Sequence, residues 1–202
     1  MTDLDLQKGS KAIELARCAM DSYVTNGKRE RPGCMKDEFY ERVGASIKLQ
    51  STRGRRRVRG SGVSYRREKH LSEAIVDAAI DASSECASTD RLGSCELDSV
   101  EVTLCVLQEV NETDQPLEDL RVGEHGVIVE RGRNHGWLLP TVPVEHGWGA
   151  EETLERTSCK ARIGRGGWRE ADATVYTFDG QVFTEREPQG DVAEVELVEQ
   201  TA

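Results

Sequence analysis

The stretch SVEVTLCVL, residues 99–107, alternates apolar side chains with other residues at Val100, Val102, Leu104 and Val106. A period of two is typical of a β-strand that turns one face toward a core. Residues 44–50 (GASIKLQ) repeat this pattern, and residues 126–129 and 137–139 are expected to form a hairpin through a turn at residues 131–133. The strand at residues 99–107 is therefore expected to belong to a mainly antiparallel sheet.

Three segments around these strands have the periodicity of helices. Apolar side chains recur at steps of three and four in residues 11–23 (KAIELARCAMDSY), where Ser10 is the expected N-cap, and in residues 70–83 (HLSEAIVDAAIDAS). Residues 150–160 (AEETLERTSCK) carry acids in the first turn and bases later, which agrees with the helix dipole. Because helices and strands do not alternate strictly, the sequence predicts an α+β fold rather than a doubly wound parallel sheet.

The C-terminal part predicts a hairpin followed by a tail. Residues 175–183 (VYTFDGQVF) place Asp179 and Gly180 between apolar pairs, which predicts a two-residue turn. Residues 187–202 are acidic and poor in large apolar side chains, so we expect a flexible tail there. The chain then consists of one domain over residues 1–186 and this tail.

The composition bounds the environment of the protein. The 202 residues include 37 acidic and 27 basic side chains, which gives a formal net charge of −10. Salt screens the self-repulsion of such a chain, so the composition favours a salt-adapted protein, with an ordinary acidic cytosolic protein as the alternative. No stretch is apolar enough for a membrane span, and the N-terminus lacks the pattern of a secretory signal. We therefore expect a cytoplasmic protein.

Cysteine and histidine spacing does not indicate a metal site. The six cysteines include no C-x-x-C pair, which argues against zinc-ribbon and thioredoxin-type sites, and a reducing compartment argues against a disulfide framework. His125, His135 and His146 are ten and eleven residues apart, which matches no compact ligand pattern. We expect no metal.

Two glycine-containing stretches fail the test of spacing. Around Ser61, the glycine positions of a G-x-S-x-G nucleophile elbow are occupied by Arg59 and Val63. Residues 164–167 (GRGG) do not complete a dinucleotide-binding fingerprint and predict a turn.

A basic segment contrasts with the acidic chain. Residues 48–70 contain nine basic side chains and one acid. If residues 55–60 (RRRVRG) form a strand, three guanidinium groups share one face and can each bind phosphate or carboxylate through two hydrogen bonds: Arg55, Arg57 and Arg59. The alternative is that these arginines pair with the chain's own carboxylates. Nucleic acid is not the expected partner, because Tyr65 is the one aromatic residue in this segment and the net charge is unfavourable.

Glu145 is a candidate site residue because it lies between two valines and a tryptophan. An unpaired carboxylate among apolar side chains is costly, so we expect Arg59 as its partner. Pro140 and Pro143 are expected to shape an extended loop before it. Structural roles remain the alternative for other conspicuous residues, with packing for Trp137, Trp148 and Trp168 and backbone freedom for Gly60 and Gly126.

Four stretches together resemble a known family. They are RVRGSG (57–62), EHG (124–126), LLPTVPVEHGW (138–148), and the Lys-Ala pair at 160–161 followed by Trp168. In this order and spacing they resemble the AMME syndrome candidate-gene domain, here called the AMMECR-one family, over residues 7–187. The arginine-rich, acidic composition further resembles members from salt-loving archaea. The residues that match the family pattern are Arg59, Gly60, His125, Gly126, Leu138, Leu139, Pro140, Glu145, Trp148, Lys160, Ala161 and Trp168.

The chain also departs from the family pattern. Ser61, Gly62 and Val63 stand where the family has cysteine, isoleucine and glycine, Ser158 followed by Cys159 replaces a late cysteine, and Arg162 replaces a glycine. A hydroxyl is harder to activate than a thiolate, which argues against a nucleophilic role for Ser61.

The resemblance implies two unequal α+β lobes, with mainly antiparallel sheets flanked by helices and a cleft between them. The matched positions suggest a site that binds a small anionic ligand through Arg59, Gly60, Ser61, Trp148 and Lys160, with Glu145 and His125 exchanging protons. The family also implies radical-SAM and Memo-like partners in a system that modifies a biomolecule. The alternative, favoured by the two serines, is a non-catalytic binding or adaptor module. No cofactor follows from the residues.

Overall fold

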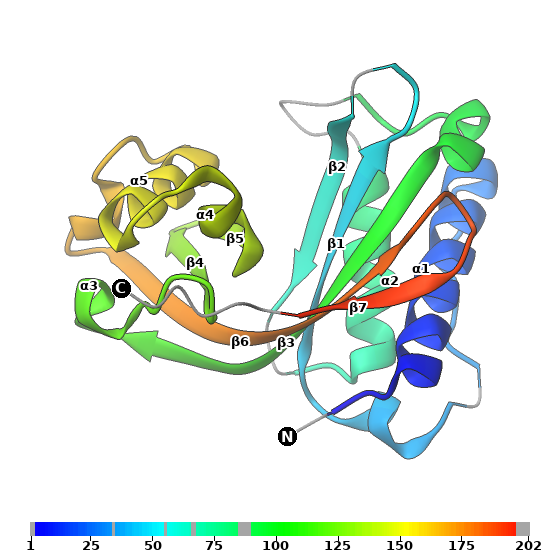
Figure 1. Cartoon of the computed structure of the whole chain (residues 1–202), viewed down its shortest axis with the longest axis horizontal. Coiled ribbons are helices and arrows are strands. Elements are labelled where there is room, and N and C mark those ends of the chain that lie inside the picture. The colour runs from blue at the N-terminus through cyan, green and yellow to red at the C-terminus, as the bar shows by residue number, and fades with distance from the viewer. Residues whose placement is uncertain (1–2, 34, 55, 66–67, 85–89, 197–202) are drawn as a thin grey trace. The chain divides into compact units, whose positions relative to one another are not determined.

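The computed structural model describes residues 3–33, 35–54, 56–65, 68–84 and 90–196. The chain divides into two compact units, which are described separately below. The first unit comprises residues 1–107 and 181–195, and the second unit comprises residues 108–180 and Glu196. The chain passes from one unit to the other inside β3 and again inside β6 (Figure 1).

The elements alternate irregularly between strand and helix. The strands are β1 (Gly44–Ser51), β2 (Arg57–Ser64), β3 (Val100–Thr113), β4 (His125–Arg131), β5 (Asn134–Leu138), β6 (Ala173–Glu185) and β7 (Val192–Val195). The α-helices are α1 (Leu6–Asn26), α2 (Leu71–Ser83), α3 (Pro116–Asp119), α4 (Thr141–His146) and α5 (Ala150–Lys160). Single turns of 3₁₀-helix are η1 (Asp37–Tyr40), η2 (Ser94–Ser99) and η3 (Gly167–Arg169). The strand order is β2-β1-β3-β6-β4-β5 with β7 beside β6, which confirms the α+β class and the mainly antiparallel sheet.

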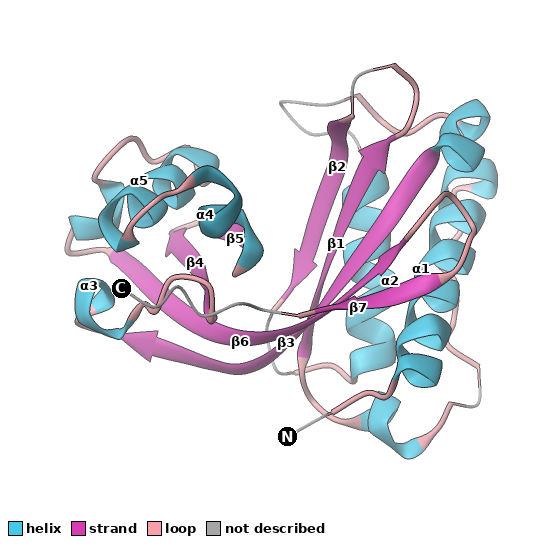
Figure 2. Ribbon diagram, in the orientation of Figure 1, coloured by secondary structure: helices cyan, strands magenta, loops and turns pink. Residues whose placement is uncertain are grey.

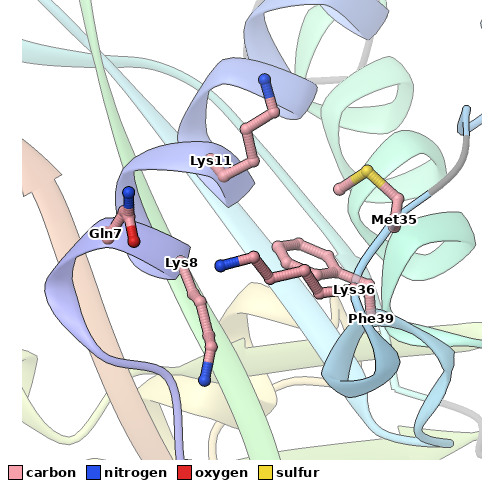
Figure 3. A pocket seen from close by; sticks show the side chains of 6 residues that line it. All are labelled: Gln7, Lys8, Lys11, Met35, Lys36 and Phe39. Carbon is pink, nitrogen blue, oxygen red and sulfur yellow. The ribbon is translucent and has the colours of Figure 1, made fainter.

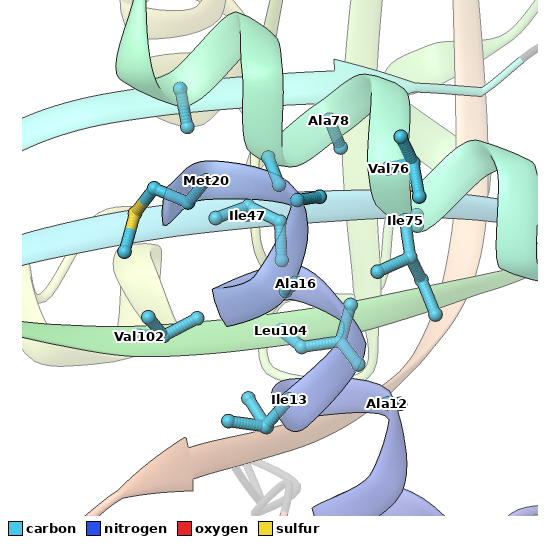
Figure 4. Close-up of a cluster of buried hydrophobic side chains, with 14 of the residues drawn as sticks. Ala12, Ile13, Ala16, Met20, Ile47, Ile75, Val76, Ala78, Val102 and Leu104 are labelled. Atoms are coloured by element: carbon cyan, nitrogen blue, oxygen red, sulfur yellow. The ribbon is translucent and has the colours of Figure 1, made fainter. Parts of the chain in front are cut away.

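The core of the first unit lies between its helices and one face of its strands. Both α1 and α2 lie on the same side of β1, β2 and β3 (Figure 2). Alternate residues of β1 and β3, such as Ile47 and Leu104, meet the apolar faces of the two helices (Figure 4). Helix α1 begins earlier than predicted, because Asp5 rather than Ser10 is its N-cap and accepts a hydrogen bond from the backbone N–H of Lys8 (2.9 Å).

The second unit packs α5 and η3 against the β4–β5 hairpin and the adjoining part of β6. Its core cluster consists of Leu120, Val127, Val129, Leu154, Trp168 and Val175. The hairpin is confirmed, and Gly132 supplies the positive φ (63°) that its tight turn requires. Strands β4 and β6 pair along the whole length of β4, from His125 opposite Asp179 to Arg131 opposite Ala173.

One prediction for the C-terminal part is wrong. Strand β6 runs unbroken through Asp179 and Gly180, so the predicted hairpin does not form. Its neighbours β4 and β7 supply hydrogen bonds along that strand and outweigh the local turn preference of Asp-Gly. Within the predicted tail, Val192–Val195 forms β7, and Val192 packs against the core of the first unit. Residues 197–202 lie outside the described part of the chain.

The extended loop predicted around Pro140 and Pro143 is also wrong. Pro140 already has helical dihedral angles (φ −54°, ψ −34°), and residues 141–146 form α4. Pro143 is tolerated because it lies in the first turn, where a backbone N–H has no partner inside the helix. As a result Glu145 is exposed on this short helix, instead of lying among apolar side chains.

Candidate functional site

A β-bulge directs the side chain of Arg59. Leu49 of β1 pairs with Gly60 of β2, whereas Gln50 pairs with Val58, so Arg59 is the extra residue of the bulge. A bulge changes the direction in which the side chain points and breaks the alternation of faces along the strand. The expected row of three arginines on one face is therefore interrupted at Arg59, and Arg55 lies outside the described residues.

The guanidinium of Arg59 is bound within its own unit. Its Nε and Nη2 each donate to one oxygen of Glu96, both at 2.7 Å, and Nη1 and Nη2 donate to the carbonyls of Asp90 (2.7 Å) and Arg91 (3.0 Å). Glu96 also accepts from the backbone N–H of Gly93 (2.9 Å). The hydrogen bonds from Arg59 lower the pKa of Glu96 to about 2. Arg59 thus fixes the segment that leads into η2.

Other basic residues of the segment have similar partners. Arg56 forms an ion pair with Glu101, and Lys69 forms one with Asp77. These contacts favour the hypothesis that the basic segment pairs with the chain's own carboxylates. Arg59 belongs to the first unit and Glu145 to the second. The expected ion pair between them stays a prediction.

Gly60 and Gly62 allow a close approach between β2 and α2. A Cβ atom at Gly60 would lie 2.0 Å from the carbonyl oxygen of Ala82, and one at Gly62 would lie 2.2 Å from that of Ala78. Both glycines therefore serve packing, and neither has a positive φ. Ser61 lies between them, half-buried and opposite Lys48 of β1.

His125 is held at the start of β4 in the second unit. Its Nδ1 lies 2.9 Å from the carbonyl oxygen of Asp119 and 3.4 Å from the backbone N–H of Arg121, and its Nε2 lies 3.6 Å from Oδ1 of Asp179. The next residue, Gly126, lies under the ring of Phe178, because a Cβ there would be 2.0 Å from that ring.

A cationic and aromatic cluster of the second unit lies at β5 and the end of α5. The ammonium of Lys160 lies 4.1 Å from the centre of the Trp137 ring and donates to the Trp137 carbonyl (2.9 Å). The ring of exposed His135 stacks on Trp137, with centroids 6.0 Å apart and an interplanar angle of 22°. We call His135, Trp137 and Lys160 the Lys160 cluster.

Local sequence explains why these residues meet. Residues two apart on a strand share a face, so His135 and Trp137 point the same way and Gly136 points toward α5. A Cβ at Gly136 would lie 2.6 Å from the carbonyl oxygen of Thr157, so the glycine brings α5 close and places Lys160 beside Trp137. The sequence predicts Lys160 as a ligand-binding residue, but it gives His135 and Trp137 no part in that site. The H-x-W spacing on a predicted strand is the signal that could have found them.

Trp148 has an aromatic and a cationic neighbour of its own. Its ring is 4.4 Å from that of His146, and the guanidinium of Arg156 lies 5.1 Å from its centre. Arg156 also pairs with Glu152 at 2.7 Å. Trp148 is half-buried, whereas Glu145 is exposed.

The serine at the position of the late family cysteine is part of the core. Ser158 is fully buried, donates to the carbonyl of Leu154 (2.9 Å) and accepts from the backbone N–H of Trp168 (3.2 Å). Among the cysteines that the structure describes, Cys159 is exposed and Cys105 is buried. Burial raises the pKa of the Cys105 thiol to about 12, which leaves it unreactive.

Within the described ranges, no group of three or more His, Cys, Asp or Glu side chains is placed to hold a metal ion. The same part of the chain contains no helix long and apolar enough to cross a membrane.

The fold defines an α+β protein whose motif residues are distributed over two units. A family model described as AMMECR1 matches residues 13–183, and the chain belongs to this family, the AMMECR-one family of the sequence resemblance. Protein VNG_2543C of Halobacterium salinarum is 39% identical over 95% of this chain and 94% of its own length. Protein MK0488 of Methanopyrus kandleri is 32% identical over 98% of both chains. The crystal structure of the uncharacterized protein PH0010 from Pyrococcus horikoshii has a TM-score of 0.82 at 31% identity, covering 96% of this chain and 99% of that one.

Proposed function

We propose that this AMMECR1-family chain is a non-catalytic binding module that uses the Lys160 cluster to hold an anionic group. The observation that carries the proposal is the ammonium of Lys160, 4.1 Å from the centre of the Trp137 ring, with His135 stacked on the same ring. A carboxylate or phosphate would contact Lys160, and a planar part of the ligand would lie against His135.

Three described residues that could have supplied a nucleophile, Ser61, Cys105 and Ser158, are not placed to do so, which supports binding rather than catalysis. Ser158 is fully buried and hydrogen-bonded in the core, and burial of Cys105 raises the pKa of its thiol. Ser61 replaces the first family cysteine, and its half-buried hydroxyl lies between two packing glycines. Arg59 is hydrogen-bonded to Glu96, so we assign the contact with the ligand to Lys160, the other cation that matches the family pattern.

A second candidate function, proton transfer, rests on His125. The Asp119 carbonyl and the backbone N–H of Arg121 both contact Nδ1 and would hold the ring with Nε2 facing the Asp179 carboxylate. An Asp–His pair of this kind can accept and release a proton during a reaction. Replacing His125 by glutamine would abolish such an activity while leaving ligand binding at Lys160 intact, which separates the two functions.

The cellular setting is proposed from family and composition. The module would act in the cytoplasm with radical-SAM and Memo-like proteins, as a component of a system that modifies a biomolecule. The net charge of −10 and the Halobacterium relative support adaptation to high salt.

A thermal-shift screen in KCl against nucleotides, S-adenosylmethionine and anionic metabolites tests the proposal. A ligand at a hundred times its dissociation constant stabilises the native state by about 2.7 kcal/mol. We expect the shift to be lost in Lys160→Gln and kept in Lys28→Gln, since Lys28 is an exposed lysine of the first unit. A shift that survives in Lys160→Gln would overturn the assignment of the Lys160 cluster, and no shift with any anion would overturn the anion-binding function.

A further inference from the structure

A small cavity of about 190 Å³ lies in the first unit, between the first turns of α1 and the segment that leads into η1 (Figure 3). It is lined by Gln7, Lys8, Lys11, Met35, Lys36 and Phe39. None of these residues belongs to the candidate site described above, and the Lys160 cluster lies in the other unit.

The wall of the cavity is apolar and anchored in the core. Phe39 is only 1% exposed and belongs to the main core cluster of the first unit, and Met35 packs against that cluster. Lysine side chains add their aliphatic stems to such a wall while their ammonium groups stay in water. The apolar wall is therefore continuous with the core of the first unit through Phe39.

Lysine side chains flank this apolar wall, and the carboxylates of Asp5, Glu14 and Glu38 lie close to their ammonium groups. Three of the seven lysines of the chain line the cavity, and no acidic side chain does. Lys8 forms an ion pair with Glu38 (2.6 Å), and this pair connects α1 to η1 at the edge of the cavity. Lys11 pairs with Glu14 (2.7 Å), but both side chains are more than half exposed, and such pairs exchange easily. Lys36 is exposed and forms no ion pair among the residues described.

We propose that this cavity binds a small monocarboxylate with a single ring or a short branched chain. A cavity of about 150 Å³ holds one benzene-sized molecule, so the volume fits one such apolar group. That group would contact Phe39 and Met35, and the carboxylate at the mouth would accept hydrogen bonds from Lys36 and Lys11. Binding thus requires both parts of the ligand.

Benzoate is the probe that tests this requirement. Its dissociation constant, measured by ligand-observed NMR on the full chain, is compared with those of benzyl alcohol, which has the ring without the charge, and acetate, which has the charge without the ring. We expect benzoate to bind at least about tenfold more tightly than either. Benzoate binding no tighter than benzyl alcohol or acetate would overturn the proposal.

Variants locate the binding. Lys36→Gln is expected to weaken benzoate about five- to tenfold and to leave benzyl alcohol unchanged, because only the charge-assisted hydrogen bond is lost. Lys28→Gln is the matched control and should bind benzoate as the unaltered chain does. Met35→Trp, checked for folding by circular dichroism, should fill the cavity and abolish binding. An unchanged benzoate affinity in Lys36→Gln would overturn the site, and Lys160→Gln should not affect it, so this test is independent of the function proposed above.

Discussion

Arg59 matches the family pattern, yet its guanidinium is hydrogen-bonded to groups of its own unit. Sequence could predict that an arginine in this strand binds a carboxylate, because the fork of the guanidinium fits one. It could not predict which one, since Glu96 lies 37 residues away and a bulge leaves no signal in the spacing of charges. The Lys160 cluster was half predictable for the same reason, because strand periodicity pairs His135 with Trp137 whereas only packing brings Lys160 to them.

The pair of Arg59 and Glu96 makes stability depend on pH. The pKa of Glu96 falls from 4.5 to about 2 in the folded chain, so the pair stabilises the fold above pH 4.5 and loses this contribution as the pH falls toward 2. Glu96→Gln is expected to lower the free energy of unfolding at neutral pH by about 1–2 kcal/mol, allowing for partial exposure. Urea unfolding at a series of pH values should show this difference shrinking below pH 4.5.

The matched control is Glu112→Gln, an exposed glutamate at the end of β3. Its effect should be small and should not change over the same pH range. A Glu96→Gln difference that stays constant down to acidic pH would show that the ion pair does not stabilise the fold.

Helices and strands were predicted correctly where the periodic pattern of apolar residues is long. They were predicted wrongly where the neighbouring strands determine the structure. Helix α5 has the predicted bounds, α2 begins one residue later than predicted, and the β4–β5 hairpin forms as expected. The Asp-Gly pair in β6 was misassigned because local turn preference carries no information about neighbouring strands. Strand β7 was missed because four residues are too few to show a period of two, and they become a strand only beside β6.

The contact between β2 and α2 depends on Gly60. A Cβ there would lie 2.0 Å from a backbone oxygen of α2, which cannot move without shifting the helix. Gly60→Ala is therefore expected to lower the free energy of unfolding by about 2–3 kcal/mol, as overpacking does, and the melting temperature by about 4–12 °C.

Gly33→Ala is the control for this substitution, because nothing lies within 4 Å of its added Cβ and its φ is not positive. Its melting temperature should stay close to that of the unaltered chain. Equal melting temperatures for Gly60→Ala and Gly33→Ala would mean that α2 does not pack on β2 as described.

The whole molecule carries a net charge of −10, and screening of that charge should stabilise it. We expect KCl to raise the melting temperature, by about 2–4 °C for each kcal/mol gained. Replacing three exposed acids of the second unit, Glu112, Asp114 and Glu118, by their amides changes the charge from −10 to −7 and should reduce this dependence. A melting temperature that falls with KCl, or an equal slope for both proteins, would contradict salt adaptation by charge.

The first unit is discontinuous in sequence, since residues 108–180 separate its two parts. During synthesis the chain leaves the ribosome from its N-terminus, so residues 108–180 are all available before the first unit is complete. The end of β6 and the whole of β7 emerge only after residues 108–180, and with them Glu185, which binds buried Arg17 of α1 at 2.5 Å. Until Glu185 has been synthesised, Arg17 lacks its carboxylate partner. The strands that are synthesised late therefore complete the unit whose helix α1 is synthesised first.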